Sequence, residues 1–382
     1  MKFVHISDTH LGYAAYRKLS ENGYNQREED ALEAFRQAVD KIIELKPDFV
    51  LHGGDLFDIV RPTNRIIHFA IEQLLRLVNA KIPTVIISGN HETPKQRYIG
   101  NVFKIIEALP VDPELLRIVY NMQYQTLTIG DATIHAIPQC RNGEEFDNEL
   151  KKLKPVPNTK NIVLAHCGVK GMKEFAHGDF NELLIDYEEL RKMPFDYIAL
   201  GHFHNFTKIT ERAFFSGSTE RMSFNEAGIK KGFIEVTLET ELKTKFHELK
   251  IRTMAEIPSV NAKGKDVNAL TGEIENHIQQ SNPKDKIMRM KIKNISPAVL
   301  SVLDVKKIRE SAKAALHFEP IFEKITEAGE IEILKTNIGG LNEEYIYFIE
   351  TSPALSKEEK SIFKEQGLHY LGKALEETEK PL

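Results

Sequence analysis

The sequence predicts an α/β protein whose main part is a mixed sheet, or two packed sheets, covered by helices. Three observations predict it. Residues 2–109 alternate strand and helix patterns, residues beyond 115 form short β-rich segments, and the pattern restarts around residues 252–258. A chain of 382 residues is long for a single hydrophobic core, so two or three domains are expected.

The first part of the chain reads as three strand–helix pairs. An apolar strand over 2–7 precedes a helix over 27–45, which has helical apolar spacing, early acidic residues and Lys41 late. A strand over 48–55 precedes a helix over 63–80, which Thr63 caps after Pro62. A strand over 83–90 precedes a helix over 98–109. This βαβαβα order implies parallel strands covered by helices.

The rest of the chain changes character twice. Short strands are expected over 125–130, 132–137, 161–166, 196–201, 232–239 and 244–251. A small α/β unit follows, with a helix over 266–280, a strand over 286–295 and a helix over 302–316. Two final helices over 341–377 break at Ser352-Pro353, and Ser356 with Glu359 forms a capping box for the second.

The composition of the chain limits where the protein can work and what it can bind. The net charge of −5 argues against a broad basic surface for nucleic acid, although bound cations could still hold phosphate. Cys140 and Cys167 have no metal-like spacing, which fits a reducing cytosol. The start "MKFVHISDTH" has no secretory pattern, and no stretch approaches the ~18 apolar residues of a membrane span. We therefore expect a cytoplasmic protein without a membrane partner.

The stretch "LGHFHNF", residues 200–206, follows a buried strand with two histidines one residue apart. In extended backbone, residues i and i+2 point to the same side, so His202 and His204 can converge on one target. Two loop histidines bonded to backbone groups are the alternative.

Five expected strands end in side chains that can bind a metal. Each has an ordinary explanation alone, such as a turn or a helix cap, but ligands gather at the carboxyl ends of strands in open α/β sheets. The seven candidates are Asp8, His10, Asp55, Asn90, His166, His202 and His204. They are too many for one tetrahedral zinc and suit two ions bridged by Asp55. Mixed carboxylate, amide and imidazole donors favour Mn²⁺ or Fe²⁺ over Mg²⁺, and two such ions can activate a shared water beside a phosphate.

This set of motifs resembles the calcineurin-like metallophosphoesterases. The segments "HISDTHLGY", "GDLFDIVRP" and "GSTERMSFNEAGIKKGF" (217–233) are also similar to the SbcD-type nucleases, the family of the meiotic-recombination nuclease. The resemblance implies a mixed two-sheet αββα sandwich with a small α/β cap domain and a C-terminal helix pair. It places the nuclease core in 1–251, a DNA-capping domain in 252–328, and a linker with the helices that bind the ATPase partner in 329–382.

The resemblance also implies an activity. The implied activity is that of a Mn²⁺-dependent DNA nuclease, a 3′–5′ exonuclease and single-strand endonuclease of double-strand-break repair. Such a nuclease is expected to work as a homodimer with an SMC-like ABC ATPase in the prokaryotic cytosol. Two Mn²⁺ ions per chain are implied, with Fe, Zn or Mg as substitutes. One ion takes Asp8, His10, Asp55 and His204, and the other takes Asp55, Asn90, His166 and His202. His91 would contact the phosphate or protonate the leaving oxygen.

Two residues depart from the family pattern. Position 58, often histidine in the family, is Asp58, and the residue after the Asn-His pair, commonly aspartate, is Glu92. Both changes resemble serine/threonine protein phosphatases, but Ile59 stands where those enzymes have a phosphate-binding arginine. We expect Asp58 to accept a hydrogen bond from His91 and assist the acid step. The alternative is that Asp58 caps the following turn.

Three parts of the predicted surface could bind partners. Tyr13, Arg17 and Lys18, in the loop after the first strand, and Arg61 could contact DNA, or the loop could be ordinary solvated chain. The helices over 63–80 and 98–109 carry more apolar positions than one buried face requires, which fits either a dimer interface or a broad core face. The C-terminal helices would bind the ATPase or pack on the cap.

Competing functions are a phosphatase, a cyclic-nucleotide phosphodiesterase and an inactive scaffold. The first two need no residues 252–382, and a decayed scaffold would have lost ligands.

Overall fold

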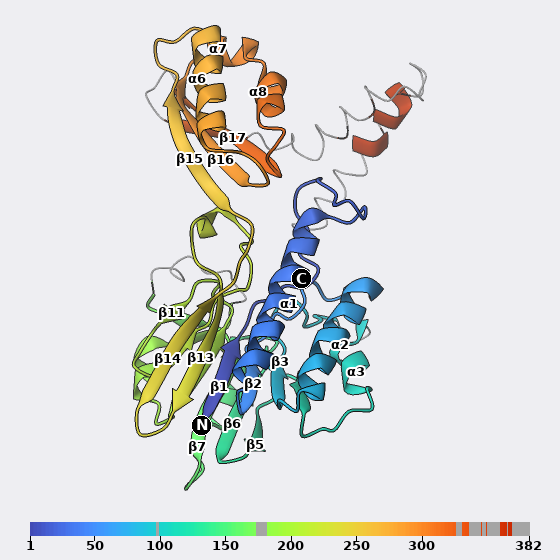
Figure 1. The fold of residues 1–382 in the computed structure, drawn as a ribbon, viewed down its shortest axis with the longest axis vertical. Coiled ribbons are helices and arrows are strands. Elements are labelled where there is room, and N and C mark those ends of the chain that lie inside the picture. The colour runs from blue at the N-terminus through green and yellow to red at the C-terminus, as the bar shows by residue number, and fades with distance from the viewer. Residues whose placement is uncertain are drawn as a thin grey trace. The chain divides into compact units, whose positions relative to one another are not determined.

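The computed structural model describes residues 1–96, 99–172, 182–325, 331–335, 345, 349, 360–364 and 366–368. The chain divides into two units, Met1–Met254 and Ala255–Leu382 (Figure 1). Among the described residues, the first unit has two large sheets and the second has one, and no hydrophobic cluster is common to the two. The expected boundary at 328/329, the break at Ser352-Pro353 and most of the two expected C-terminal helices lie outside the described residues.

The first unit contains two six-stranded sheets. The first sheet has the order β14-β13-β1-β2-β3-β4 and the second has the order β11-β12-β10-β7-β6-β5. The first comprises β1 (Lys2–Ile6), β2 (Phe49–His52), β3 (Thr84–Ile87), β4 (Leu116–Val119), β13 (Gly232–Leu238) and β14 (Leu242–Glu248). The second comprises β5 (Gln125–Ile129), β6 (Ala132–Ile137), β7 (Lys160–His166), β10 (Tyr197–Gly201), β11 (Thr207–Lys208) and β12 (Ala213–Phe215). A small parallel pair, β8 (Gly168–Lys170) and β9 (Leu184–Asp186), lies apart from both.

Both sheets are buried on two faces, which makes the fold a four-layer αββα sandwich. In β1, Val4 and Ile6 pack with the helices α1 (Gln26–Leu45), α2 (Asn64–Asn79) and α3 (Phe103–Glu107), whereas Phe3 packs between the sheets. This division follows from the two-residue period of a strand. Apolar residues on the outer face of the second sheet pack with α4 (Gly143–Leu150) and α5 (Tyr187–Lys192). The expected fold class is confirmed.

The long helices begin where the sequence indicated. The Asn25 side chain caps α1 by accepting from Arg27 N at 2.9 Å, and the Thr63 side chain caps α2 as expected. The expected third helix is shorter, because α3 covers only Phe103–Glu107 and has no side-chain cap. Gly100, at φ +73°, lies outside the helical region of backbone space and interrupts the expected span.

Strand register brings the carboxyl ends of the strands together within each sheet. In the first sheet, Ile6 of β1 pairs with His52 of β2, which in turn pairs with Ile86 of β3. In the second sheet, His166 of β7 pairs with Gly201 of β10. The segments that follow these strands therefore start side by side.

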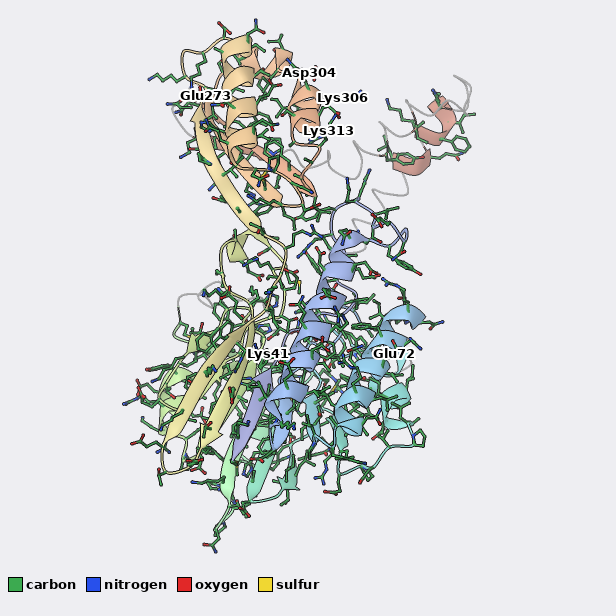
Figure 2. All side chains as sticks on the ribbon, viewed as in Figure 1. Lys41, Glu72, Glu273, Asp304, Lys306 and Lys313 are labelled. Carbon is green, nitrogen blue, oxygen red and sulfur yellow. The ribbon has the colours of Figure 1, made fainter. Side chains whose placement is uncertain are left out.

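The second unit has a four-stranded sheet packed against helices. The sheet order is β15 (Met254–Asn261), β16 (Ile287–Ile295), β17 (His317–Ile325) and β18 (Ile331–Lys335), and the helices are α6 (Val267–Gln280), α7 (Pro297–Val302) and α8 (Val305–Ser311). The expected helix over 302–316 is wrong in extent, because Asp304 caps a new helix by accepting from Lys307 N at 2.9 Å. Figure 2 shows Lys306 and Lys313 directed outward, while Ile308 is buried in the core of the unit.

Among the helices that the structure describes, none is both long enough and apolar enough to cross a lipid bilayer.

Candidate metal centre

The segments that follow β1 and β2 run beside each other and carry three of the expected ligands. Asp8 N donates to Gly54 O at 3.0 Å, and His10 N donates to Asp55 O at 3.0 Å. Asp8, His10 and Asp55 have φ values of 52°, 45° and 53°. Left-handed backbone is uncommon for residues other than glycine, and such positions cluster at functional sites. The two strand exits therefore turn sharply and present their side chains to one point.

Glycines allow the strand ends of the two sheets to approach. A Cβ atom on Gly201 would collide with the carbonyl oxygen of Gly53, and a Cβ atom on Gly89 would collide with the Asp55 carboxylate. Any other residue at 89 or 201 would push these backbones apart. These contacts join the ends of β2, β3 and β10 around one site.

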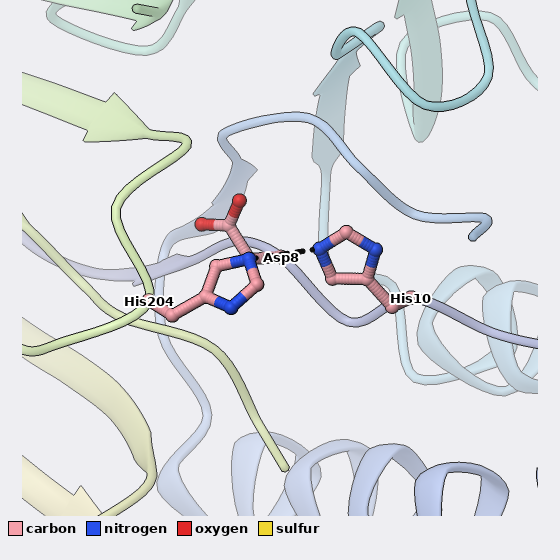
Figure 3. Close-up of side chains that lie close together, drawn as sticks. All are labelled: Asp8, His10 and His204. Atoms are coloured by element: carbon pink, nitrogen blue, oxygen red, sulfur yellow. Dashed lines mark hydrogen bonds between the residues drawn. The ribbon is translucent and has the colours of Figure 1, made fainter. Parts of the chain in front are cut away.

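Asp8, His10 and His204 form the first ligand cluster (Figure 3). One donor atom from each lies within 4.8 Å of the others. The Nε2 atoms of His10 and His204 are 3.1 Å apart, and Asp55 Oδ2 lies 3.7 Å from His10 Nε2. Residues separated by almost two hundred positions thus meet at one point.

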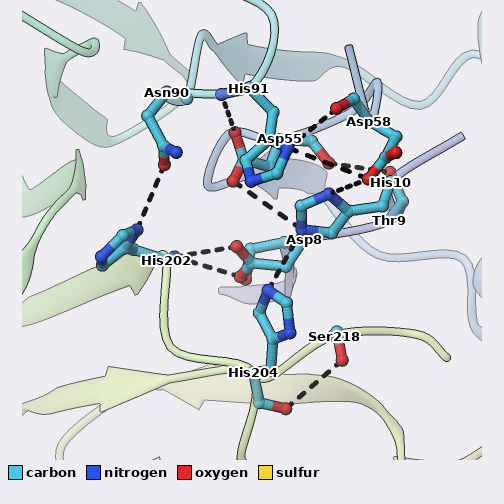
Figure 4. Close-up of polar contacts among 12 residues, drawn as sticks. Asp8, Thr9, His10, Asp55, Asp58, Asn90, His91, His202, His204 and Ser218 are labelled. Carbon is cyan, nitrogen blue, oxygen red and sulfur yellow. Dashed lines mark hydrogen bonds and ion pairs between the residues drawn. The ribbon is translucent and has the colours of Figure 1, made fainter. Parts of the chain in front are cut away.

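Asp55, His166 and His202 form the second cluster, of which Figure 4 labels Asp55 and His202. His166 Nε2 lies 3.3 Å from Asp55 Oδ2 and 2.9 Å from Asn90 Oδ1. His202 Nδ1 lies 3.2 Å from the same amide oxygen. Asp55 borders both clusters, and all seven expected ligands lie in this one region. That is the arrangement that a bridging carboxylate needs.

The donor chemistry fits a pair of cations. The Nδ1 atoms of His10 and His204 lie 3.1 Å from carboxylate oxygens of Asp58 and Glu226, respectively. An imidazole that donates from Nδ1 presents an unprotonated Nε2. Two such lone pairs 3.1 Å apart repel unless a proton or a cation lies between them. Imidazole, carboxylate and amide donors together suit Mn²⁺ or Fe²⁺.

Buried charge in the site favours an anionic Asp55. Burial alone would raise the pKa of Asp55, but His166 and His10 outweigh it and hold that pKa well below its usual range. Burial lowers the pKa of His166, but Asp55 outweighs it and raises that pKa to about 9. A proton on His166 thus competes with a cation for the same carboxylate, so cation binding should release protons.

The Glu92 side chain joins the segments that follow β2 and β3. Its Oε1 accepts from Asp55 N at 3.0 Å and from Gly89 N at 2.8 Å. Burial and then the Asp55 carboxylate raise the pKa of Glu92 well above its usual range. The longer side chain at this position, noted from the sequence as a departure, therefore holds two loops together.

The contact between Asp58 and His91 differs from the expected one. His91 Nδ1 lies 2.8 Å from the backbone carbonyl of Asp58, whereas the Asp58 carboxylate is 3.8 Å from that nitrogen. The carboxylate hydrogen-bonds His10 Nδ1 at 3.1 Å instead. The His91 side chain is 41% exposed, so it lies at the rim of the site. The orientation of His91 is thus set by main chain, and Asp58 acts on an expected ligand.

The residues expected to contact DNA fall into two groups. Arg17, Lys18 and Arg61 are exposed. Tyr13 is half-buried, its hydroxyl donates to Met222 O at 2.5 Å, and the guanidinium carbon of Arg27 lies 5.8 Å from its ring centroid. Tyr13 therefore braces the loop internally, and the three basic residues remain open to solvent.

The sequence did not reveal the carboxylates that contact the ring nitrogens of His202 and His204. Glu182 Oε1 lies 2.8 Å from His202 Nε2, and Glu226 Oε1 lies 3.1 Å from His204 Nδ1. His166 uses a carbonyl in the same way, with Nδ1 2.8 Å from Gly53 O. Glu226 lies inside the recognised segment 217–233, which was a usable signal, whereas nothing in the sequence around Glu182 marks it.

Comparison with known proteins defines the class. The model of the calcineurin-like phosphoesterase family matches residues 1–206, and the chain belongs to this family. More particularly, it is similar to proteins named DNA double-strand break repair protein Mre11. The one from Methanococcus maripaludis is 32% identical over 244 residues, 59% of this chain and 59% of that protein. The one from Sulfurisphaera tokodaii is 35% identical over 205 residues, 53% of this chain and 49% of that protein.

A longer alignment exists at lower identity. The Mre11 protein of Archaeoglobus fulgidus is 27% identical over 403 residues, which covers 93% of this chain and 85% of that protein. The chain thus spans about half to three fifths of the first two relatives and most of this one.

Proposed function

We propose that the chain is a Mn²⁺-dependent nuclease that hydrolyses DNA phosphodiesters in double-strand-break repair, as a 3′–5′ exonuclease and a single-strand endonuclease. One observation carries the proposal: two ligand clusters come from the ends of four strands, and Asp55 of the second lies 3.7 Å from His10 of the first. The names of the Mre11 relatives support DNA as the substrate. Mn²⁺ is preferred to Mg²⁺ because imidazole nitrogens make up much of the donor set.

Each residue has a place in this proposal. When bound, two divalent cations supply Lewis acidity to a phosphate and lower the pKa of a water. Asp8, His10 and His204 would hold one cation, Asn90, His166 and His202 would hold the other, and Asp55 would contribute to both. His91, at the exposed rim and oriented by the Asp58 carbonyl, donates a proton to the leaving sugar oxygen.

The partners are part of the proposal. We place a homodimer interface on α2 and α3, where Ile67, Phe69 and Ile71 are only partly buried and Ile105 is 51% exposed. Residues 252–328 would cap bound DNA, and residues 329–382 would bind an SMC-like ABC ATPase in the prokaryotic cytosol. Light scattering should give a dimer at micromolar concentration. Deletion of 340–382 should end co-purification with the ATPase and spare nuclease activity.

A substrate panel tests the activity. With Mn²⁺ present, purified protein is given plasmid, linear duplex, p-nitrophenyl phosphate and bis-p-nitrophenyl phosphate. We expect cleavage of DNA and of the diester, and loss of both in Asp55→Ala with the fold retained by circular dichroism. Near-normal cleavage by Asp55→Ala under saturating Mn²⁺ would remove the bridging role. Turnover of the monoester alone would favour the phosphatase alternative.

A further inference from the structure

The segment 217–233 closes on the back of His204. Ser218 N donates to His204 O at 3.0 Å. Gly217 has φ +77°, and a Cβ atom there would lie 2.9 Å from His204 O and 2.6 Å from Phe206 N. The backbone can approach this closely because position 217 is glycine. Side chains from this segment are therefore held against a candidate ligand.

Glu226 reaches the ring of that ligand. Its Oε1 lies 3.1 Å from His204 Nδ1, and its Oε2 accepts from Met222 N at 3.3 Å. Glu226 is only 7% exposed, so little water competes for the carboxylate. An imidazole can carry its proton on either nitrogen, and a carboxylate beside Nδ1 selects the tautomer with the proton there.

Lys231 contacts both the Glu226 carboxylate and the main-chain carbonyl of His204. Its Nζ lies 2.5 Å from Glu226 Oε2 and donates to His204 O at 2.6 Å. Lys231 is 1% exposed. A buried ammonium is costly unless it is paired and hydrogen-bonded, and these two contacts supply both. The side chain and the backbone of His204 are thus fixed by one buried cation.

We propose that Glu226 and Lys231 are positioning residues that keep His204 as an Nε2 donor and thereby set the cation affinity of the Asp8–His10–His204 position. The inference rests on the proposed metal centre. His204 Nε2 faces His10 Nε2 at 3.1 Å, so a proton on that nitrogen would point at the place where a cation binds. Removal of such an orienting partner typically weakens metal binding about 10–100-fold.

The test measures cation binding and tautomer rather than catalysis. Full-length wild type, Glu226→Met and Glu226→Met/Lys231→Met are titrated with Mn²⁺ by calorimetry. The double variant removes both charges, so it avoids the unpaired buried ammonium that could unfold the single variant. Metal-free samples with ¹⁵N-labelled histidine are examined by long-range ¹H–¹⁵N correlation NMR. The matched control is Glu235→Met, because Glu235 Oε2 lies 2.7 Å from His247 Nε2 and neither residue is a candidate ligand.

The expected results separate this inference from the proposed function. Wild type and the control should bind two Mn²⁺ ions, and the double variant should bind one with unchanged affinity and the other about 10–100-fold more weakly. The His204 signals should leave the Nδ1–H tautomer in the variant alone. Two unaltered affinities in a folded variant, or an equal loss at both positions, would overturn the inference. No Mn²⁺ binding by wild type would overturn the metal centre itself.

Discussion

Removal of the Glu92 side chain should loosen the loops that present Asp55 and Asn90. Glu92 Oε1 accepts from Asp55 N at 3.0 Å and Gly89 N at 2.8 Å, and the residue is fully buried. In Glu92→Ala both amides lose their acceptor. A buried unsatisfied donor costs about 1–3 kcal/mol, so two cost about 2–6 kcal/mol. Domains of this kind are stable by only about 5–15 kcal/mol, which makes the loss large.

Glu92→Gln is the matched comparison. Burial and the Asp55 carboxylate raise the pKa of Glu92 well above its usual range, so a neutral side chain of the same shape is close to the native state. The amide oxygen can accept from both backbone donors, and we expect a change below about 1 kcal/mol.

Peptide-resolved hydrogen exchange on metal-free protein is the direct assay, with thermal unfolding beside it. In Glu92→Ala, exchange should accelerate in peptides that contain Asp55 and Gly89 and stay unchanged over β5 (Gln125–Ile129). Unchanged protection at both amides in Glu92→Ala would refute the reasoning. So would an equal acceleration in Glu92→Gln, because that variant retains the acceptor.

Three further predictions address pH, the acid step and DNA. Burial lowers the pKa of His5 to about 3, so between about 6.5 and 3 the unfolded chain binds a proton that the folded chain does not, and stability falls as pH falls through this window. His5→Asn, which can still bond the Tyr197 hydroxyl, should reduce the slope of unfolding free energy by up to about 1.4 kcal/mol per pH unit, and an unchanged slope in urea titrations would contradict this. Asp58→Asn should slow DNA and bis-p-nitrophenyl phosphate cleavage equally, since its carboxylate bonds His10, whereas a loss confined to DNA would return Asp58 to the acid step. Arg17→Ala/Lys18→Ala should flatten the salt dependence of DNA binding in fluorescence anisotropy, and a wild-type slope would remove this loop from the interface.

The sequence predicted the parts of the molecule that follow from local pattern. The strand over 2–7 was predicted from a run of apolar residues, and the Thr63 cap is a local hydrogen bond. The candidate ligands could be identified from the sequence because each lies at the end of a strand or within a few residues after it. Parallel register then brings strand ends together without further information, as the pairing of His166 with Gly201 shows.

Features that depend on distant partners were not readable. Glu226 ends a short 3-10 helix (Phe224–Glu226) and Glu182 precedes β9, and only the folded chain brings their carboxylates to His204 and His202. The helix expected over 302–316 failed for a related reason. Its apolar spacing continues through residue 304, but Asp304 gains more as a cap for α8 than as a helix-interior residue. Periodicity alone gives no account of that competition.

Asp58 shows how far local reasoning reaches. Asp58 follows Asp55 by three residues, and its carboxylate lies 3.1 Å from His10 Nδ1 and 3.8 Å from His91 Nδ1. Which imidazole the Asp58 carboxylate bonds depends on the position of His91. The His91 Nδ1 atom lies 2.8 Å from the Asp58 carbonyl oxygen and bonds that group instead of the carboxylate. The carboxylate is then free to bond His10 at 3.1 Å. One residue thus orients two imidazoles with two different groups, so substitution of the Asp58 side chain should disturb His10 and spare His91.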